Sequence, residues 1–312
     1  MISFINKIFR KKSSRVILTS KDDLNQDVSP TSIDRTDVTQ EDETSPSRPV
    51  NPRLEPPQLI VGIGQSVGIQ RDHNEDSVFT LTTNLTSGDN NLRFGLYIVA
   101  DGMGGHENGE IASSVAVSEL SSHVINSLYL PIFSTPENKQ ELSVQEVMHT
   151  GVIHAHQKIK KQALGSGTTL TAALILGDQM TIAHVGDSRA YMIDPVGNIQ
   201  LLTHDHSLVK RLEDIGQISS EQASVHPQRN VLYRALGQGE PFEPDISTFH
   251  LNQGNQLLVC TDGLWGVIPE NEISNVIQTS TDPQTACQIL VNLANAAGGP
   301  DNISAIIVRI PE

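Results

Sequence analysis

Five aspartates stand at the ends of apolar runs, each beside glycine or another turn residue. An apolar strand delivers such a carboxylate to its end, and a following glycine lets the backbone come close to whatever is held there. For any one of these residues, ordinary turn chemistry is the alternative, because Asp and Gly are common turn formers. The five are Asp76 in RDHNED, Asp101 in ADGMGGH, Asp187 in HVGDSRAY, Asp262 in CTDGLWG and Asp301 in GGPDN.

Five such positions in one acidic chain predict a bound cation, because carboxylates brought together without a counter-charge repel one another and titrate upward. Oxygen ligands without a His/Cys cluster favour the hard ions Mg²⁺ or Mn²⁺ over zinc or copper. Two such ions about 4 Å apart can clamp a phosphoryl group and activate a shared water. Arg71, five residues before Asp76, could grip two phosphoryl oxygens, although its spacing also allows a surface ion pair with Asp72 or Glu75.

Short β-rich runs must position these residues. Several runs are joined by turns of hairpin length, so neighbouring strands are expected to be antiparallel. The runs span residues 59–69, 76–83, 92–100, 168–176, 179–186, 189–194, 199–203, 246–251, 256–261 and 302–310.

Helical spacing of apolar residues appears between these strand groups. One stripe covers 117–128 and another 144–163. Two more helices are expected late in the chain, one starting near Pro269 and one capped by Asp282 with Pro283 in its first turn. Strand runs broken by paired helices, rather than regular strand–helix alternation, predict an α+β layered sandwich.

Charge divides the 312-residue chain in two. Residues 1–58 carry nine basic and nine acidic side chains, so the whole formal charge of −15 lies on residues 59–312, with twelve bases against twenty-seven acids. A polyanionic body repels phosphate backbones, so nucleic acid is not an expected partner. We interpret 1–58 as a disordered acidic and Pro-rich tether, because 20–58 lacks an apolar period, and 59–312 as the domain that folds alone.

The first twelve residues combine apolar and basic side chains. Their spacing suits a short amphipathic helix in weak contact with an anionic membrane surface, and a solvated tail is the alternative because so short a helix is marginal. No apolar run approaches the roughly 18 residues of a membrane span, and no signal-peptide core is present. We therefore expect a cytoplasmic protein, and we expect a monomer. Cys260 and Cys287 lie in apolar stretches and are expected to be buried thiols.

Seven motifs in order along residues 59–312 carry a resemblance to a known family: RxxNEDS, DGMGGHxxGExAS, SGTTLTAALI, GDSRAY, HPQRNVLYRALG, CTDGLWG and GGPDNIS. They resemble the metal-dependent serine/threonine protein phosphatases (type 2C), and most of all the bacterial branch. The resemblance implies a four-layer αββα sandwich, in which two antiparallel sheets are flanked by helix pairs. It also implies a flap subdomain at about 207–232 that shapes protein-substrate access.

The same resemblance implies a site for two Mn²⁺ or Mg²⁺ ions. Carried over by motif, Asp101 would bridge both ions and the Gly102 carbonyl would bind one of them. Asp262 and Asp301 would bind the other ion. Asp76 would hold the water molecules that these ions bind.

Two positions bear on the finer points of this chemistry. Asp187 matches the residue that bacterial members use, together with Asp262, for a third and weaker ion. Many eukaryotic members have His directly after the metal-binding Asp-Gly, proposed to protonate the leaving oxygen, whereas this chain has Met103 there. The acid must come from elsewhere, and His106 and a metal-bound water remain open alternatives.

The activity expected from the resemblance is hydrolysis of phosphoserine and phosphothreonine on proteins by direct attack of water, which would reverse kinase action in signalling. Phosphorylated proteins, Ser/Thr kinases among them, are the expected partners. Two alternatives are a catalytically silent phosphoprotein-binding module and a phosphatase devoted to one partner, such as an anti-sigma-factor antagonist. The first is disfavoured because every carboxylate that the metal pair requires is present, and the second because the flap is complete.

Overall fold

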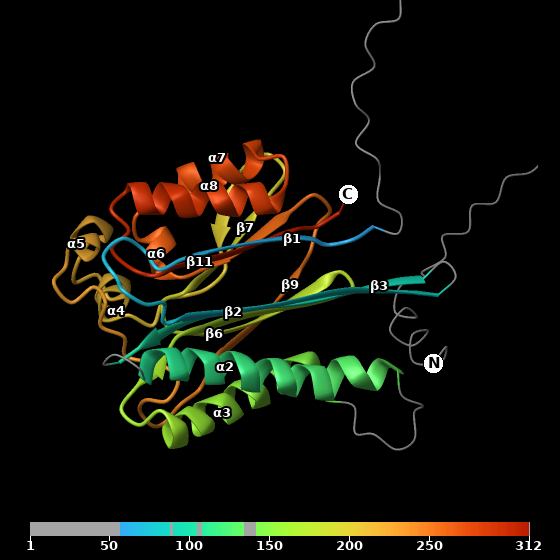
Figure 1. Ribbon diagram of the computed structural model, residues 1–312, viewed down its shortest axis with the longest axis horizontal. Helices are drawn as coiled ribbons and strands as arrows, with labels where there is room; N and C mark the ends of the chain where they lie inside the picture. The colour runs from blue at the N-terminus through green and yellow to red at the C-terminus, as the bar shows by residue number, and fades with distance from the viewer. Residues whose placement is uncertain (1–56, 88–89, 105–107, 134–141, 312) are drawn as a thin grey trace, which may run out of the picture. The chain divides into compact units, whose positions relative to one another are not determined.

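A computed structural model describes residues 57–311 of the protein, except 88–89, 105–107 and 134–141 (Figure 1). The described residues belong to one compact unit, Leu54–Glu312. The basic segment 1–12, nearly all of the tether and His106 lie outside the described residues, so the expectations about them remain predictions.

Two antiparallel sheets form the centre of the described part of the chain. One contains β1 (Ile60–Ser66), β11 (Ile303–Arg309), β10 (Gln256–Cys260), β7 (Arg189–Ile193) and β8 (Ile199–Leu201), in that spatial order. The other contains β2 (Asp76–Ser87), β3 (Asn90–Met103), β5 (Leu170–Leu176), β6 (Gln179–Val185) and β9 (Asp245–His250), with the short β4 (Gly167–Thr168) also paired to β3.

Helices cover the outer face of each sheet, as Figure 1 shows. The sheet that contains β3 is covered by α2 (Asn108–Val124) and α3 (Val144–Gln162), and the sheet that contains β11 by α7 (Glu270–Thr279) and α8 (Pro283–Ala296). A short π-helical turn, Ile125–Tyr129, and a 3₁₀ turn, Leu130–Phe133, continue α2. The four-layer αββα sandwich expected from the sequence is therefore confirmed.

Alternation along β3 shows why the layers stack in this way. Phe94, Leu96 and Ile98 pack toward α2 and α3, whereas Tyr97 and Val99 belong to the core between the two sheets. Side chains of a strand point alternately to opposite faces, so a strand buried on both sides reads as one continuous apolar run. A third core lies between the other sheet and α7 and α8.

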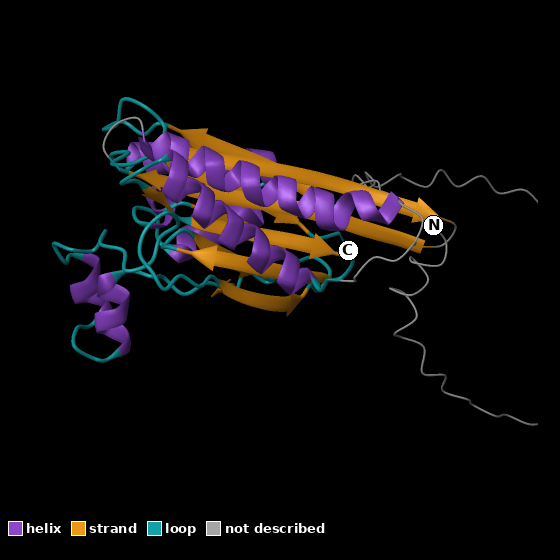
Figure 2. Cartoon of the chain, turned by 90° about the horizontal axis from the view of Figure 1, so that it is seen from below, coloured by secondary structure: helices purple, strands orange, loops and turns teal. Residues whose placement is uncertain are grey.

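Two short helices interrupt the chain between β8 and β9. They are α4 (Leu208–Asp214) and α5 (Ser220–Ser224), each capped by a serine side chain, and Figure 2 shows them set apart from the layers at the end where β2 begins. They occupy the stretch expected to form the flap. One further helix, α6 (Asp262–Trp265), was not expected, because four residues are too few to display a helical period.

Among the described residues, none of the helices combines the length and apolar character needed to cross a membrane.

Candidate active site

Strand register brings the first two aspartates together. Asp76, the first residue of β2, is the direct cross-strand partner of Asp101 near the end of β3. Directly opposed side chains in an antiparallel pair have Cβ atoms about 5 Å apart on the same face. The β2–β3 pairing therefore places two carboxylates side by side at one end of the sandwich.

The backbone of Asp101 is held by two threonines of the SGTT motif. Its N–H donates to Thr169 Oγ1 at 2.9 Å, and its carbonyl oxygen accepts from the Thr169 N–H and from Thr168 Oγ1, each at 2.9 Å. Both threonines are buried. Their hydroxyls therefore position the carboxylate of β3, which agrees with a structural and not a nucleophilic role for this motif.

The glycines after Asp101 and Asp262 allow close backbone packing. A Cβ on Gly102 would lie 2.2 Å from the Gly109 carbonyl oxygen, and one on Gly263 would lie 2.0 Å from the Asn302 carbonyl oxygen. No side chain fits at such distances. At both positions, glycine lets the element that carries an aspartate, β3 or α6, lie directly against a neighbouring segment.

The second pair of aspartates comes from the other sheet. Asp262 directly follows Thr261 at the end of β10, and Asp301 lies just before β11, its antiparallel neighbour. The two sheets meet at Thr261, whose hydroxyl donates to Asp76 Oδ2 at 3.0 Å and accepts from the Ser304 N–H at 3.0 Å. This buried hydrogen-bond bridge joins the two halves of the acidic cluster, here defined as Asp76, Asp101, Asp187, Asp262 and Asp301.

Asn302 is a site-building residue that sequence reasoning did not identify. Its Nδ2 donates to the carbonyl oxygens of Val67 and His73, and its Oδ1 accepts from the Glu75 N–H at 2.8 Å. It therefore ties the loop before Asp76 to the start of β11. The only signal in the sequence was a polar residue directly after Asp301 where an apolar strand begins.

Burial and mutual repulsion shift the titration of the cluster. Burial, opposed by hydrogen bonds from Ser304 and Thr261 and assisted by neighbouring carboxylates, raises the pKa of Asp76 to about 7. Burial and the charge of Asp301 raise the pKa of Asp262 to about 6, although a hydrogen bond with the Asp101 side chain lowers it. The pKa values of the two remaining buried members are raised well above the ordinary range by burial first and neighbouring aspartates second; they are Asp101 and Asp187.

The cluster fits hard divalent cations by its donor chemistry. Asp76 Oδ1 and Asp262 Oδ1 are buried without a hydrogen-bond partner. Buried carboxylate oxygens without partners are costly unless a cation or a proton neutralises them. Within the described ranges, no three His, Cys, Asp or Glu side chains lie close enough together to hold an ion without some movement.

Arg71 has its ion-pair partner in the acidic cluster. Its Nη2 donates to Asp301 Oδ2 at 2.7 Å. Arg71 therefore pairs with a member of the cluster and not with Asp72 or Glu75.

Asp187 lies in the turn between β6 and β7, and its carbonyl oxygen accepts from Trp265 Nε1 at 3.0 Å. Two residues on, Arg189 grips Asp205 with contacts of 2.7 to 3.2 Å, and its guanidinium carbon lies 3.5 Å from the centre of the Trp265 ring. Asp205, in the stretch His204–Ser207 (HDHS), is therefore the ion-pair partner of a half-buried arginine. Trp265 therefore packs against Arg189 and donates a hydrogen bond, which is a structural role.

The two histidines of this stretch also have structural partners. His206 Nδ1 accepts from the Gly186 N–H at 3.1 Å, so the imidazole donates from Nε2 to Asp245 Oδ2 at 3.1 Å. His204 Nε2 lies 2.8 Å from Asp214 Oδ2 at the surface. Both histidines are therefore engaged with neighbouring residues of the fold.

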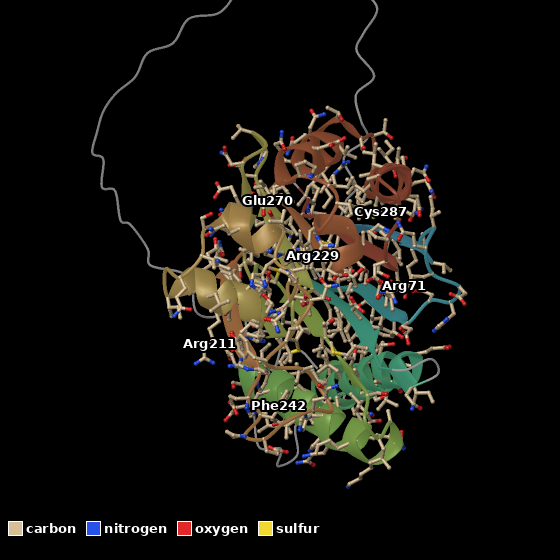
Figure 3. All side chains as sticks on the ribbon, turned by 90° about the vertical axis from the view of Figure 1, so that its left-hand side faces the viewer. Arg71, Arg211, Arg229, Phe242, Glu270 and Cys287 are labelled. Atoms are coloured by element: carbon tan, nitrogen blue, oxygen red, sulfur yellow. The ribbon has the colours of Figure 1, made fainter. Side chains whose placement is uncertain are left out.

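Flap and cluster are electrostatically connected. The positive charges of Arg71 and Arg229 both act to lower the pKa of Asp262, although burial has the larger, opposite effect. Figure 3 shows Arg71 and Arg229 on the same face of the molecule. The positive charge of Arg229, in the segment after α5, therefore acts on a member of the acidic cluster.

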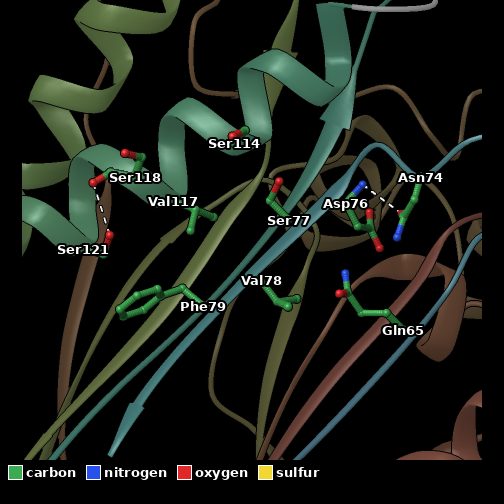
Figure 4. Close-up of a pocket in the computed structure, with 10 residues that line it drawn as sticks. All are labelled: Gln65, Asn74, Asp76, Ser77, Val78, Phe79, Ser114, Val117, Ser118 and Ser121. Carbon is green, nitrogen blue, oxygen red and sulfur yellow. Dashed lines mark hydrogen bonds between the residues drawn. The ribbon is translucent and has the colours of Figure 1, made fainter.

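A groove of about 470 Å³ runs beside β2, as Figure 4 shows. Asp76 is the one member of the acidic cluster that lines it, so the groove lies next to the cluster and not over it. Its other lining residues are mostly hydroxyl- and amide-bearing; they are Gln65, Asn74, Ser77, Val78, Phe79, Ser114, Val117, Ser118 and Ser121.

The structure thus defines a two-sheet αββα sandwich with a buried acidic cluster where the sheets meet at one end. A family model described as Protein phosphatase 2C matches residues 64–303, so the chain belongs to the protein phosphatase 2C family. The chain is 36% identical over 241 residues to the serine/threonine phosphatase stp of Listeria welshimeri, which covers 77% of this chain and 91% of that protein.

Solved structures agree with this family assignment. The serine/threonine phosphatase PstP/Ppp of Mycobacterium tuberculosis matches with a TM-score of 0.68 and 29% identity, over 82% of this chain and 100% of that chain. The catalytic domain of PstP in complex with two manganese ions matches with a TM-score of 0.66 and 28% identity, over 82% of this chain and 99% of that chain.

Proposed function

We propose that the chain hydrolyses phosphoserine and phosphothreonine on proteins, with two Mn²⁺ or Mg²⁺ ions held by the acidic cluster. The observation that carries this proposal is that aspartates from both sheets lie close enough to act on one another electrostatically, two of them with buried carboxylate oxygens that have no hydrogen-bond partner. Membership of the protein phosphatase 2C family and similarity to named serine/threonine phosphatases support the same activity.

Each residue that would hold the ions has a place in this proposal. Asp101 would bridge both ions, with the Gly102 carbonyl on one of them and Asp262 and Asp301 on the other. Bound together, the ions would supply Lewis-acid neutralisation of the phosphoryl charge and activation of water. Asp187, with Asp262, would hold a third and weaker ion.

The chain's own contacts prepare these side chains for the task. Thr168 and Thr169 orient Asp101 through its backbone, so the carboxylate itself stays available. Asp76 accepts from Thr261 with one oxygen, which leaves its other oxygen to orient a water molecule by accepting its hydrogen. Such pre-organisation removes reorganisation cost from the reaction.

Arg71 is the proposed phosphate-binding residue. Its guanidinium donates to Asp301 in this structure, so it can turn to phosphoryl oxygens when Asp301 has another counter-charge. A guanidinium can hold two equatorial oxygens in a bidentate fashion and neutralise charge that develops on them.

The proton for the leaving alkoxide has two possible sources, His106 and a water in the site, because Met103 cannot donate one. We propose His106 as the acid to be tested first. The variant His106→Ala should slow turnover of a phosphopeptide more than that of p-nitrophenyl phosphate, whose leaving group needs little help. Equal losses on both substrates would remove His106 from this role.

The decisive test of the function is phosphate release from a phosphothreonine peptide by the full chain. Release should require Mn²⁺ or Mg²⁺, stop on addition of a chelator and resume when the ion is restored. Asp101→Asn should abolish release, and calorimetric titration with Mn²⁺ should show weakened ion binding while circular dichroism shows an intact fold. Near-wild-type turnover by this variant would refute the assignment, and phosphopeptide binding without release by the wild type would favour the silent binding module.

Further proposals concern partners and location. We propose phosphorylated Ser/Thr kinases as substrates, and assays with a phosphorylated kinase domain and with a phosphorylated anti-sigma-factor antagonist separate a broad from a dedicated phosphatase. We propose that the protein is a cytoplasmic monomer, which cell fractionation and sedimentation would test. For residues 1–12 we propose weak contact with anionic membranes, and equal liposome binding by the full chain and by residues 59–312 would refute it.

A further inference from the structure

An arginine of the flap lies over an aromatic ring without an acidic partner. The guanidinium carbon of Arg211, in α4, lies 5.8 Å from the centre of the Tyr233 ring, within the range of a cation–π contact. Among the described residues, Arg211 makes no ion pair, in contrast to its neighbour Lys210, which pairs with Glu213 at 2.9 Å, and to Arg234, which pairs with Asp245 at 2.7 Å.

Two side chains with exposed apolar surface accompany this unpaired charge. Ile215 follows Arg211 by four residues, the spacing that places two side chains on one side of a helix, and it is 61% exposed. Tyr233 is 43% exposed even though two guanidinium groups flank its ring. We call Arg211, Ile215 and Tyr233 the Arg211 face.

The chain connects this face to the acidic cluster. Leu236, three residues after Tyr233, exchanges backbone hydrogen bonds of 2.9 and 3.1 Å with Thr168, the residue whose hydroxyl donates to the Asp101 carbonyl. Three residues span at most about 10 Å, so the Arg211 face lies near the end of the sandwich that carries the cluster. Thr168 is in turn the cross-strand partner of Gly102, and each cross-strand step adds about 5 Å, so the path from Tyr233 to the backbone beside Asp101 is at most about 20 Å, which an extended peptide covers in about six residues. In the view of Figure 3, Arg229 lies between Arg211 and Arg71.

Charge complementarity indicates what binds there. Residues 59–312 carry twenty-seven acids against twelve bases, so most of the surface repels an acidic peptide. An unpaired guanidinium in the flap therefore favours acidic over neutral flanking residues. Arg229 also makes no ion pair among the described residues, but its guanidinium donates to the Ser224 carbonyl oxygen and its charge acts on Asp262 inside the site, whereas Arg211 has no such engagement. Apolar surface at Ile215 and Tyr233 can cover the aliphatic part of a glutamate side chain.

We propose that the Arg211 face recognises acidic residues of the substrate within about six positions of the phosphoresidue. This inference rests on the proposed phosphatase function and makes it more specific: the favoured substrates are phosphoproteins with acidic flanks. The contact lies away from the reacting phosphoryl group, so it acts on substrate capture and not on the chemistry.

The test compares three phosphothreonine peptides that differ only in carrying Glu, Gln or Lys at these flanking positions. The wild-type full chain should show a kcat/KM about threefold to fivefold higher for the Glu peptide than for the Gln peptide, as expected for a partly exposed ion pair. Arg211→Gln should remove this preference through KM and leave hydrolysis of p-nitrophenyl phosphate unchanged. Added salt should weaken the wild-type preference, because exposed charges are screened.

Arg309→Gln is the charge control. It removes the same charge at the far end of β11, six residues or about 20 Å along the strand from Ile303, which follows the site residue Asp301 by two positions. Unlike Arg211, Arg309 also donates to Gln256 Oε1 and to the Thr281 carbonyl oxygen, so circular dichroism should confirm that this variant is folded; it should leave the peptide preference intact. The inference is overturned if the wild type prefers Lys or shows no preference, if Arg211→Gln keeps the preference, or if Arg309→Gln abolishes it equally. Loss of p-nitrophenyl phosphate hydrolysis in Arg211→Gln would also overturn it, whereas a wild type inactive on every substrate would refute the proposed function itself.

Discussion

Replacing Asp262 by asparagine should stabilise the metal-free protein at high pH. The pKa of Asp262 is raised from 3.8 to about 6, chiefly by burial. Between these two values the folded protein binds more protons than the unfolded chain, so stability is lost as the pH rises through this window. Asparagine does not titrate, so Asp262→Asn escapes this loss.

The size of the effect follows from the pKa shift. About two pKa units correspond to about 3 kcal/mol of unfavourable ionisation in the folded state. A neutral acceptor makes a weaker hydrogen bond with Asp101, which costs about 1 kcal/mol. The net gain is about 2 kcal/mol at pH 8, or an increase in Tm of about 4 to 8 °C for a domain of this size. At pH 4 the two proteins should differ little.

Thermal unfolding followed by circular dichroism, with a chelator at pH 4 and pH 8, measures this difference. Saturating Mn²⁺ should then make the wild type the more stable of the two, because an ion that binds only the folded state, at a concentration of about 100 times its Kd, contributes about 2.7 kcal/mol to the wild type.

Asp282→Ala is a control of opposite sign. Asp282 caps α8, and the hydrogen bond from the Thr285 N–H is the largest of the contacts that lower its pKa to about 2. Loss of the Asp282 carboxylate in this variant should therefore destabilise the protein more at pH 8 than at pH 3. If Asp262→Asn instead lowers Tm at pH 8 without metal, the picture of crowded carboxylates is refuted.

Two further substitutions test how the site is built. Gly102→Ala would place a methyl group 2.2 Å from a backbone carbonyl oxygen, and chemical denaturation should show a loss of roughly 2 to 4 kcal/mol; an unchanged denaturation midpoint would contradict the packing argument. Asp205→Ala would leave the half-buried Arg189 without its bidentate partner, at a cost of roughly 3 to 5 kcal/mol, while Asp205→Asn should cost less; equal stability of both variants with the wild type would show that this ion pair contributes nothing.

Local pattern was sufficient to predict most of the fold. The strands read as short apolar runs bounded by turn residues and the main helices carry apolar residues at a period of 3.6, and these signals lie within the segments themselves. The start of α8 at Asp282 and Pro283 was predicted for the same reason, since a cap and the first turn are neighbours in sequence. In contrast, α6 was missed because its four residues contain no complete period, and β2 extends to Ser87, past the predicted end at residue 83, because its pairing with β3 carries it onward.

The family and the aspartates of the candidate site were also accessible from the sequence, because the motifs that carry them are short and contiguous. Their arrangement was not. Only the β2–β3 register places Asp76 opposite Asp101, and only the folded chain brings Arg71 onto Asp301, 230 residues away in sequence.

The sequence by itself determined which residue types are available and which elements carry them, because periodicity, caps and motifs are local properties. Tertiary structure alone decided the protonation of the acidic cluster, the role of Asn302 in tying the loop before Asp76 to the start of β11 and the exposure of Arg211 over Tyr233. The physical reason is that burial, repulsion between charges and the satisfaction of hydrogen bonds depend on neighbours in space, and those neighbours come from strands and loops that are distant along the chain.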